Sequence, residues 1–300
     1  MKQFFPPPAN CNEINLADWI EITVIRSPKK TFNLSELETI LRKSGLFETS
    51  DSTSEIEQRK IEDLCRKVNF EIGNRITSAQ ESYPFKFDKN ILKPKSDFKR
   101  FRVYIYCLCL SYFSLEKNIK VNIIQRRLFE ELSCIASQKF FNGKSLKFGW
   151  PRTKMNSKFE MAIEELCNWL GEGGGFKDQP LDKSKDRQLD LVAWLEFPDG
   201  KSGKFIIFGQ CSTGNNWETK TKELEPLGFC KNWLKEVPKS QIVKAFFIPH
   251  RVPSGNWDRH TVDAGIIFDR CRISYLASKQ KKLEKSYLKN CEKLLSVKIA

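Results

Sequence analysis

The sequence predicts an α/β protein (α+β overall): an N-terminal helical domain, residues 1–145, precedes a mixed sheet flanked by helices, residues 150–300. Three observations support this fold class. The length of 300 residues suits two domains of roughly 100–200 residues each. With 40% hydrophobic and 12% aromatic residues, the chain can build buried cores. The apolar periodicity changes from helical to strand-like near residue 185.

Composition narrows the function classes. The net charge of +14, from 51 Lys and Arg against 37 Asp and Glu, favours a polyanionic partner such as DNA, with plain solubility as the alternative. The ten cysteines are scattered without a CxxC pair, and the N-terminus lacks a signal-like segment, so we expect reduced thiols in a cytoplasmic protein. Two histidines argue against His-rich metal chemistry. The most apolar stretch, 103–115, is too short to span a bilayer, so no membrane is expected.

The first half of the chain reads as helical. A helix is expected from Asn33 to Gly45, which is a suitable C′ glycine. An amphipathic helix follows over 56–76, residues 99–115 are apolar all round and predict a buried helix, and 121–138 predict another. Such a domain could bind DNA, bind a partner protein or serve as a structural layer.

The second half opens with a helix over 157–170. Ser157 and Glu160 have the spacing of a capping box, and Gly171 with the run 173–175 ends the helix.

Strand-like segments and short helices follow. The turn residues 198–200 predict a hairpin, 215–224 predict a helix, and a helical piece is expected around Trp233. The last segment, 276–300, reads as an amphipathic helix with a lysine-rich face. The expected strands, which should share one sheet, are 189–197, 204–210, 245–249 and 265–276.

Three segments in this order carry a family resemblance. They are Phe159-Glu160 at a helix start, residues 185–192 with Asp190 before an apolar run, and residues 205–212 with Gln210 near a strand end. Their order and spacing resemble the core of the PD-(D/E)XK nuclease superfamily, and within it the Mrr-like restriction endonucleases. The resemblance runs from about residue 156 to 275.

This resemblance implies a Mg²⁺-dependent endonuclease of double-stranded DNA, with Mn²⁺ as a substitute ion and a role in prokaryotic restriction or antiphage defence. Phosphodiester hydrolysis needs a hard cation to polarise the phosphate and acidify a water, and Mg²⁺ prefers oxygen ligands. Asp190 would be the main carboxylate, Gln210 would offer its side-chain carbonyl and Cys211 its backbone carbonyl. Glu160 would bind a second ion or a metal-bound water.

Two departures from the family pattern affect catalysis. Gln188 replaces the family glycine before the aspartate, and Ser212 stands where the motif lysine is expected. A serine cannot offset transition-state charge, so we expect Lys220, on the following helix, to bring its ammonium to Asp190. If no lysine reaches the site, the domain is a DNA-binding pseudonuclease.

Each residue also has a purely structural interpretation. Asp190 would then be a turn residue, Gln210 a sheet-edge cap and Lys220 a solvated helix lysine. Glu160 would be the capping-box member. Glu164 and Asp186 are weaker candidates for the site. Trp217 and Trp257 lie in aromatic-basic segments that could contact DNA or belong to the core, and the core is favoured for Trp217 only. His250 and His260 are ascribed to the structure.

Three function classes therefore remain. The first is the nuclease, which would act as an oligomer if each strand needs its own site. The second is a catalytically inactive nucleic-acid-binding subunit of a larger complex. The third is an interaction scaffold whose helical domain is the functional part. An ammonium group near Asp190 and Gln210 would favour the first over the second, and salt-sensitive DNA binding would separate both from the third.

Overall fold

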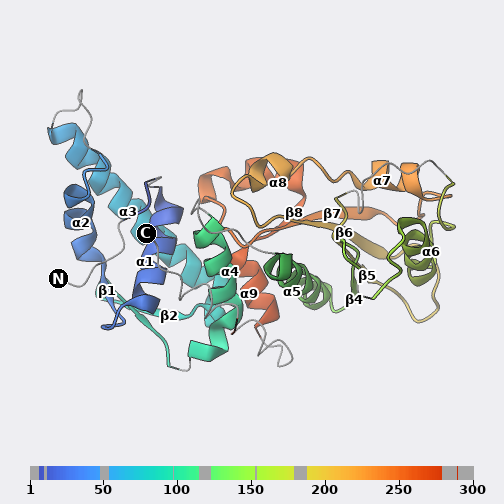
Figure 1. Ribbon diagram of the computed structural model, residues 1–300, viewed down its shortest axis with the longest axis horizontal. Helices are drawn as coiled ribbons and strands as arrows, with labels where there is room; N and C mark the ends of the chain where they lie inside the picture. The colour runs from blue at the N-terminus through green and yellow to red at the C-terminus, as the bar shows by residue number, and fades with distance from the viewer. Residues whose placement is uncertain are drawn as a thin grey trace. The chain divides into compact units, whose positions relative to one another are not determined.

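The computed structural model divides into two compact units, which are described separately (Figure 1). One unit comprises Met1–Lys120 together with Ser278–Ala300, and the other spans Val121–Ala277, whereas the sequence predicted domains of residues 1–145 and 150–300. The structure describes residues 7–9, 12–47, 54–96, 98–114, 123–152, 154–178, 188–278 and 289.

The first unit is built around three helices that pack together, α1 (Glu13–Arg26), α3 (Ser54–Ala79) and α4 (Arg102–Ser114). Helix α1 begins at Asn12, whose side chain accepts a hydrogen bond from Asn15 N at 2.8 Å. Every residue of α4 from Arg102 to Phe113 is buried, which confirms the predicted buried helix. The helix expected after Asn33 is also present, as a 3₁₀ turn (Leu34–Glu36) followed by α2 (Leu37–Lys43).

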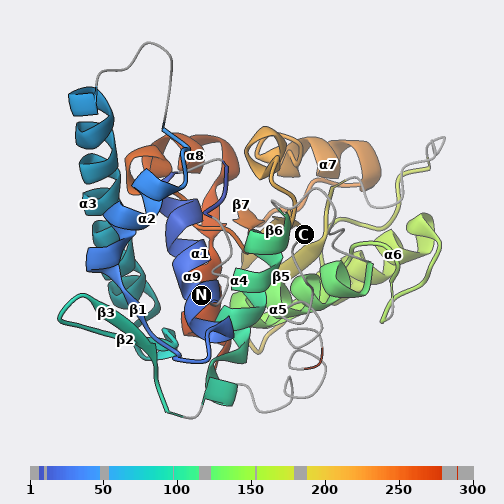
Figure 2. The ribbon, with the colours of Figure 1, turned by 60° about the vertical axis from the view of Figure 1, so that its left-hand side comes forward.

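This unit also contains a small antiparallel sheet, so the expectation of a purely helical domain was incomplete (Figure 2). Its order is β1-β3-β2, formed by Phe32–Asn33, Ile91–Pro94 and Phe85–Asp88. Lys89 and Asn90 connect β2 to β3 and both have positive φ, as a type I′ hairpin turn requires. Strands of two to four residues are too short to show alternation in a sequence.

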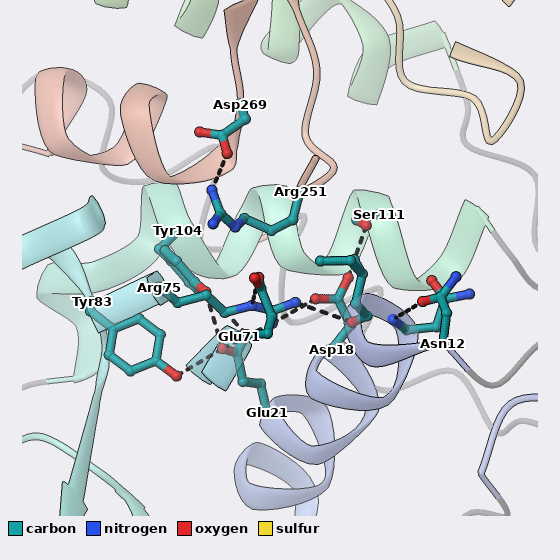
Figure 3. A network of polar contacts seen from close by, with 12 residues as sticks. Asn12, Asp18, Glu21, Glu71, Arg75, Tyr83, Tyr104, Ser111, Arg251 and Asp269 are labelled. Atoms are coloured by element: carbon teal, nitrogen blue, oxygen red, sulfur yellow. Dashed lines mark hydrogen bonds and ion pairs between the residues drawn. The ribbon is translucent and has the colours of Figure 1, made fainter. Parts of the chain in front are cut away.

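A buried ion network joins the helices of the first unit (Figure 3). Arg75 on α3 is fully buried, and its Nη1 lies 2.8 Å from Asp18 Oδ1 and 3.1 Å from Glu21 Oε1. Its Nε donates to Glu71 Oε1 at 2.7 Å, and its Nη2 donates to Ile14 O at 3.1 Å. Burial by itself lowers the pKa of Arg75, but the three carboxylates outweigh it and hold that pKa well above the ordinary value.

Hydroxyl groups complete this network. Tyr83 Oη donates to Glu21 Oε1 at 2.9 Å, and Tyr104 Oη approaches the same carboxylate at 3.1 and 3.2 Å. Ser111 Oγ donates to Asp18 Oδ2 at 2.9 Å. Each carboxylate thus has a charged partner, and two of them also accept hydroxyl hydrogen bonds, which is how a protein accommodates buried charge.

The second unit is a five-stranded sheet of order β4-β5-β6-β7-β8 between two layers of helices. The β4-β5 and β5-β6 pairs are antiparallel, whereas β6, β7 and β8 are parallel neighbours. This places the expected four strands in one mixed sheet, as predicted. The strands are β4 (Lys144–Lys147), β5 (Leu191–Leu195), β6 (Phe205–Cys211), β7 (Ile242–Phe247) and β8 (Ile266–Phe268).

Helices cover both faces of this sheet (Figure 1). The face formed by Val192, Ile206 and Phe208 packs against α6 and α7 in one hydrophobic cluster. The opposite face packs against α5, which in turn contacts α9. The helices are α5 (Ile123–Phe141), α6 (Phe159–Leu170), α7 (Pro226–Trp233), α8 (Trp257–Ala264) and α9 (Arg270–Ala277).

The turn predicted at 198–200 does join β5 to β6. Gly200 has φ +66° and its N–H donates to Phe197 O at 3.1 Å, while Asp199 accepts a hydrogen bond from Lys201 N. The antiparallel register pairs Leu191 with Gly209, so the start of β5 and the end of β6 lie at one edge of the sheet.

Several sequence expectations for the second unit were wrong. Residues 265–276 were expected to form one strand, but only Ile266–Phe268 does, because Asp269 accepts a hydrogen bond from Arg272 N at 3.0 Å and α9 begins there. The helix expected over 215–224 is a 3₁₀ turn, Trp217–Lys220, followed by irregular chain. Strand β4 was missed altogether.

The capping box was also wrong, since the N-cap of α6 is Lys158 and no side chain caps it. The helix predicted over 276–300 lies almost wholly outside the described residues.

Two further observations concern membrane-spanning helices and cysteines. Among the residues that the structure describes, no helix is both long and apolar enough to cross a membrane. The eight cysteines within the described ranges are free thiols.

Candidate functional site

Asp190 and Gln210 meet at the edge of the sheet where β5 begins and β6 ends. Asp190 N donates to Gly209 O at 2.9 Å, which continues the β5–β6 ladder by one residue. The Asp190 Oδ2 atom accepts a hydrogen bond from Cys211 N at 2.6 Å. The carboxylate is therefore held against the end of the neighbouring strand. Ligands of open α/β sheets commonly bind outside the carboxyl ends of parallel strands, and β6 and β7 both end here.

The segment after β4 fixes Asp190 from the other side. Phe148 N and Gly149 N both donate to Asp190 O at 2.8 Å. A Cβ at Gly149 would lie 2.9 Å from Asp190 Oδ1 and 3.3 Å from its Cα, so a side chain at this position would press on the aspartate. Glycine allows the close approach.

Gln188, which stands where the motif resembled in the sequence has glycine, adopts a left-handed backbone conformation with φ +64°. This region is favourable for glycine and costs other residues on the order of 1–3 kcal/mol. The chain bends there, two residues before Asp190, and leads the aspartate into β5. The backbone at this position is thus one that glycine would adopt without strain.

Gln210 is 3% exposed and has one side-chain hydrogen bond, from Nε2 to Glu223 Oε2 at 2.8 Å. A carboxylate only accepts hydrogen bonds, so this contact fixes which end of the amide faces Glu223. The other end, Oε1, is buried and has no hydrogen-bond partner among the described residues. Buried amide oxygens are normally paired, so this one calls for a water or a cation.

Ser212 repeats this feature two residues later. It is 3% exposed, its backbone N donates to Phe247 O at 2.9 Å, and its Oγ is buried without a hydrogen-bond partner in the described part of the chain. The end of β6 therefore carries two buried oxygens without partners, Gln210 Oε1 and Ser212 Oγ, close to the Asp190 carboxylate.

The structure does not bring Lys220 into contact with this group. Lys220 ends the 3₁₀ turn and is half-buried, and its ammonium forms no ion pair or hydrogen bond with any described residue. Lys222, two residues further along, has a side chain that is 75% exposed and lies 3.4 Å from Asp263. Trp217 and Leu224 are both buried.

The acids on α6 differ in their roles. Glu160 is half-buried in the first helical turn and makes no ion pair or hydrogen bond with the described residues. Glu164 accepts a hydrogen bond from Phe176 N at 2.9 Å and supports the glycine-rich loop after the helix. Asp186 lies outside the described residues.

Cys211 has its thiol on the α5 side of the sheet. Burial raises the pKa of this thiol well above its ordinary value, and the nearby carboxylates of Asp190 and Glu130 add to the effect. Glu130 itself is paired with Lys147, 2.9 Å away.

The aromatic and basic residues downstream pack or pair with other residues of the second unit. Trp217 packs with Phe246 and Ile248, and Trp257 lies under the guanidinium of Arg272, 4.4 Å from its ring centroid. Arg251 is buried and forms an ion pair with Asp269 (Figure 3).

Glu223 is the site residue that sequence reasoning missed. It follows the 3₁₀ turn, is exposed, and reaches Gln210 across the strand end. No motif marks it, because only the fold places it there. It lines a cavity of about 220 Å³ with Gln188, Phe229, Asn232 and Trp233. Across the described ranges, no group of three or more His, Cys, Asp or Glu residues is arranged to hold a metal ion.

Comparison of the chain with protein-family models, curated proteins and solved structures found no match. The residues at the strand edge are therefore interpreted from their geometry and chemistry.

Proposed function

We propose that the second unit is a Mg²⁺-dependent endonuclease that hydrolyses phosphodiester bonds of double-stranded DNA. The observation that supports this most directly is the pair of unpartnered buried oxygens, Gln210 Oε1 and Ser212 Oγ, beside the Asp190 carboxylate. Such a set is costly to bury without a ligand and is suited to a hard cation. Positive φ at Gln188, where the family has glycine, also supports the resemblance.

The oxygen atoms of these residues are suited to bind a Mg²⁺ ion. Asp190 would supply the charged oxygen, Gln210 and Ser212 neutral oxygens, and Cys211 its backbone carbonyl. One or two carboxylates suffice, since Mg²⁺ keeps several of its waters. When bound, the ion would polarise the phosphate and acidify a water. Glu223 positions the Gln210 amide by accepting from its Nε2, so that Oε1 points away from Glu223.

The remaining catalytic assignments concern two side chains, Lys220 and Glu160, that form no ion pair or hydrogen bond with the described residues. Lys220 has a long, unpaired side chain in the described structure, and we propose that it approaches the site when DNA binds and offsets charge on the phosphate. Glu160 is proposed to hold a second ion or a metal-bound water. The net charge of +14 favours DNA as substrate, and the role in prokaryotic restriction or antiphage defence rests on the resemblance alone.

Incubation with supercoiled plasmid and Mg²⁺ tests the proposal. Wild-type protein should nick or linearise the plasmid, and EDTA should stop the reaction. Asp190→Asn should reduce cleavage to background while the retained side-chain oxygen still accepts from Cys211 N. Asp258→Ala, at an exposed aspartate of α8, is the control and should cleave at the wild-type rate. Normal cleavage by Asp190→Asn would show that the site is elsewhere.

The inactive binding subunit is the second candidate. It is favoured by Ser212 at the lysine position and by the absence of contacts from Lys220 among the described residues. This candidate predicts salt-sensitive DNA binding with no cleavage under any divalent ion. A gel shift run beside the plasmid assay separates the two, because only the nuclease yields a product.

A further inference from the structure

A second recess lies at the opposite end of the β5–β6 hairpin. It has a volume of about 530 Å³ and is formed by the end of α6, the residues after β5 and the chain that leads into β4. This size is within the range of small-ligand sites. We call it the hairpin pocket. At roughly 3.3 Å per residue along the five residues of β5, it lies about 17 Å from Asp190.

Three aromatic side chains line the hairpin pocket, Trp169, Trp194 and Phe197. Trp169 is 43% exposed and Phe197 is 70% exposed, which is unusual for rings of this size, whereas Trp194 is buried. Trp194 is held by its Nε1, which donates to Glu196 Oε2 at 3.1 Å. The rings of Trp169 and Phe197 are thus available as flat apolar surfaces, and the buried Trp194 is a fixed part of the wall between the pocket and the core.

Polar groups lie among these rings. The amides of Asn142 and Asn168 line the same recess and can both donate and accept hydrogen bonds. Glu196, also in the lining, forms an ion pair with Lys144 as well as its bond to Trp194. The Lys144 ammonium, followed by the indole N–H, lowers the pKa of Glu196, so this carboxylate is ionised and neutralised locally.

Lys204 adds positive charge to the wall. It is 6% exposed, and its Nζ donates to Leu170 O at 2.7 Å, at the C-terminus of α6. A cation here complements the helix dipole. Among the described residues this ammonium has no carboxylate within ion-pair distance. The charged residues that line the pocket are two lysines and one glutamate, Lys144, Lys204 and Glu196, so the pocket combines flat rings and amides with an excess of positive charge.

We propose that the hairpin pocket binds an unstacked nucleobase, with its phosphate facing the basic side. Stacking needs flat π-surfaces, base edges need groups that donate and accept, and the phosphate needs positive charge; the pocket offers all three. The base belongs either to a free nucleotide or to a single strand. Binding here requires no catalysis at Asp190, so the proposal does not depend on nuclease activity.

Isothermal titration with dTMP, with an octamer of thymidylate and with a duplex of the same length tests this proposal. The octamer should bind more tightly than the duplex, and binding of dTMP as well would show that a free nucleotide suffices. Stacking of one base is worth about 1–3 kcal/mol by alanine substitution, or roughly 5–150-fold in affinity. Phe197→Ala and Trp169→Ala should each weaken octamer binding within that range.

Phe70→Ala is the matched control, because Phe70 is 66% exposed on α3 of the first unit. It should leave octamer affinity unchanged. Both pocket variants remove exposed rings and should fold, which thermal denaturation would verify. Equal affinity of wild type, Phe197→Ala and Trp169→Ala for the octamer would overturn the proposal, as would equal weakening of octamer and duplex, which would indicate contacts to the backbone alone.

Discussion

Arg75 in the first unit holds three buried carboxylates, and tyrosine and serine hydroxyls complete their hydrogen bonds. Gln210 in the second unit is almost as buried, yet its Oε1 has no partner among the described residues. In the first arrangement, each charged group has an ion-pair partner. In the second, two oxygens at the end of β6 are buried without a hydrogen-bond partner or an ion pair among the described residues.

The difference separates structural polar groups from functional ones. A network whose members satisfy one another stabilises the fold and has no capacity left for a ligand. Buried oxygens without hydrogen-bond partners destabilise a protein that has no ligand bound. We expect such oxygens where a water, an ion or another ligand supplies the missing partner. We therefore infer that the buried charges of the first unit stabilise its fold. We expect ligand binding and catalysis at the end of β6.

The largest effect is expected from Arg75→Leu. Removal of the guanidinium would leave the buried carboxylates of Asp18, Glu21 and Glu71 uncompensated, and breaking a buried ion pair costs about 3–5 kcal/mol. Urea denaturation should show this loss. The control is Arg66→Leu, since Arg66 is 80% exposed and its ion pair with Asp63 lies at the surface, where solvent screens the interaction. Similar stabilities for the two variants would show that the network is dispensable.

The next largest effect concerns the positive charge that we propose Lys220 brings to the end of β6. Lys220→Ala should reduce plasmid cleavage by roughly 10²–10³-fold, the usual loss of one transition-state charge contact. Lys222→Ala should not, because Lys222 is exposed and pairs with Asp263. Near-wild-type rates for both variants would mean that the charge is supplied elsewhere or is not needed. Folding should be unaffected in either case.

The sequence predicted the second unit well where periodicity is long and turns are explicit. Helix α6, the β5–β6 hairpin and the strand at β7 all follow from apolar runs and from the turn at 198–200. Short elements were missed, since β1 to β4 have too few residues to show a period. At 265–276, buried residues recur at helical spacing after Asp269, and the apolar content alone had suggested a strand.

For the candidate site, the strand residues were predictable and the loop residues were not. Asp190 and Gln210 are adjacent because an antiparallel hairpin brings a strand start to a strand end. Glu223 reaches Gln210 through irregular chain, which no sequence period describes. Lys220 was placed on a helix that proved to be a 3₁₀ turn, so its direction could not be derived from helical spacing.

The smallest stability effect, and the sharpest test of the comparison, is expected from Gln210→Leu. The substitution removes one hydrogen bond to the Glu223 carboxylate, of the class worth about 1.5–3 kcal/mol, and the loss is reduced because Glu223 is exposed and can bond to water instead. It also removes the unpartnered Oε1, whose desolvation costs about 1–3 kcal/mol. The two effects nearly cancel, so the free energy of unfolding should change by about 1 kcal/mol or less.

Tyr104→Phe in the first unit is the matched comparison. Tyr104 is fully buried, and its hydroxyl donates to the Glu21 carboxylate, so the loss of a hydrogen bond to a charged group should cost about 1.5–3 kcal/mol. Gln210→Leu should thus lower the free energy of unfolding less than Tyr104→Phe does. The Gln210→Leu variant should nevertheless lose plasmid cleavage. If Gln210→Leu were the more destabilising of the two, Oε1 must already be satisfied by an internal water, and the unpartnered oxygens would no longer distinguish the β6 edge from the buried network around Arg75.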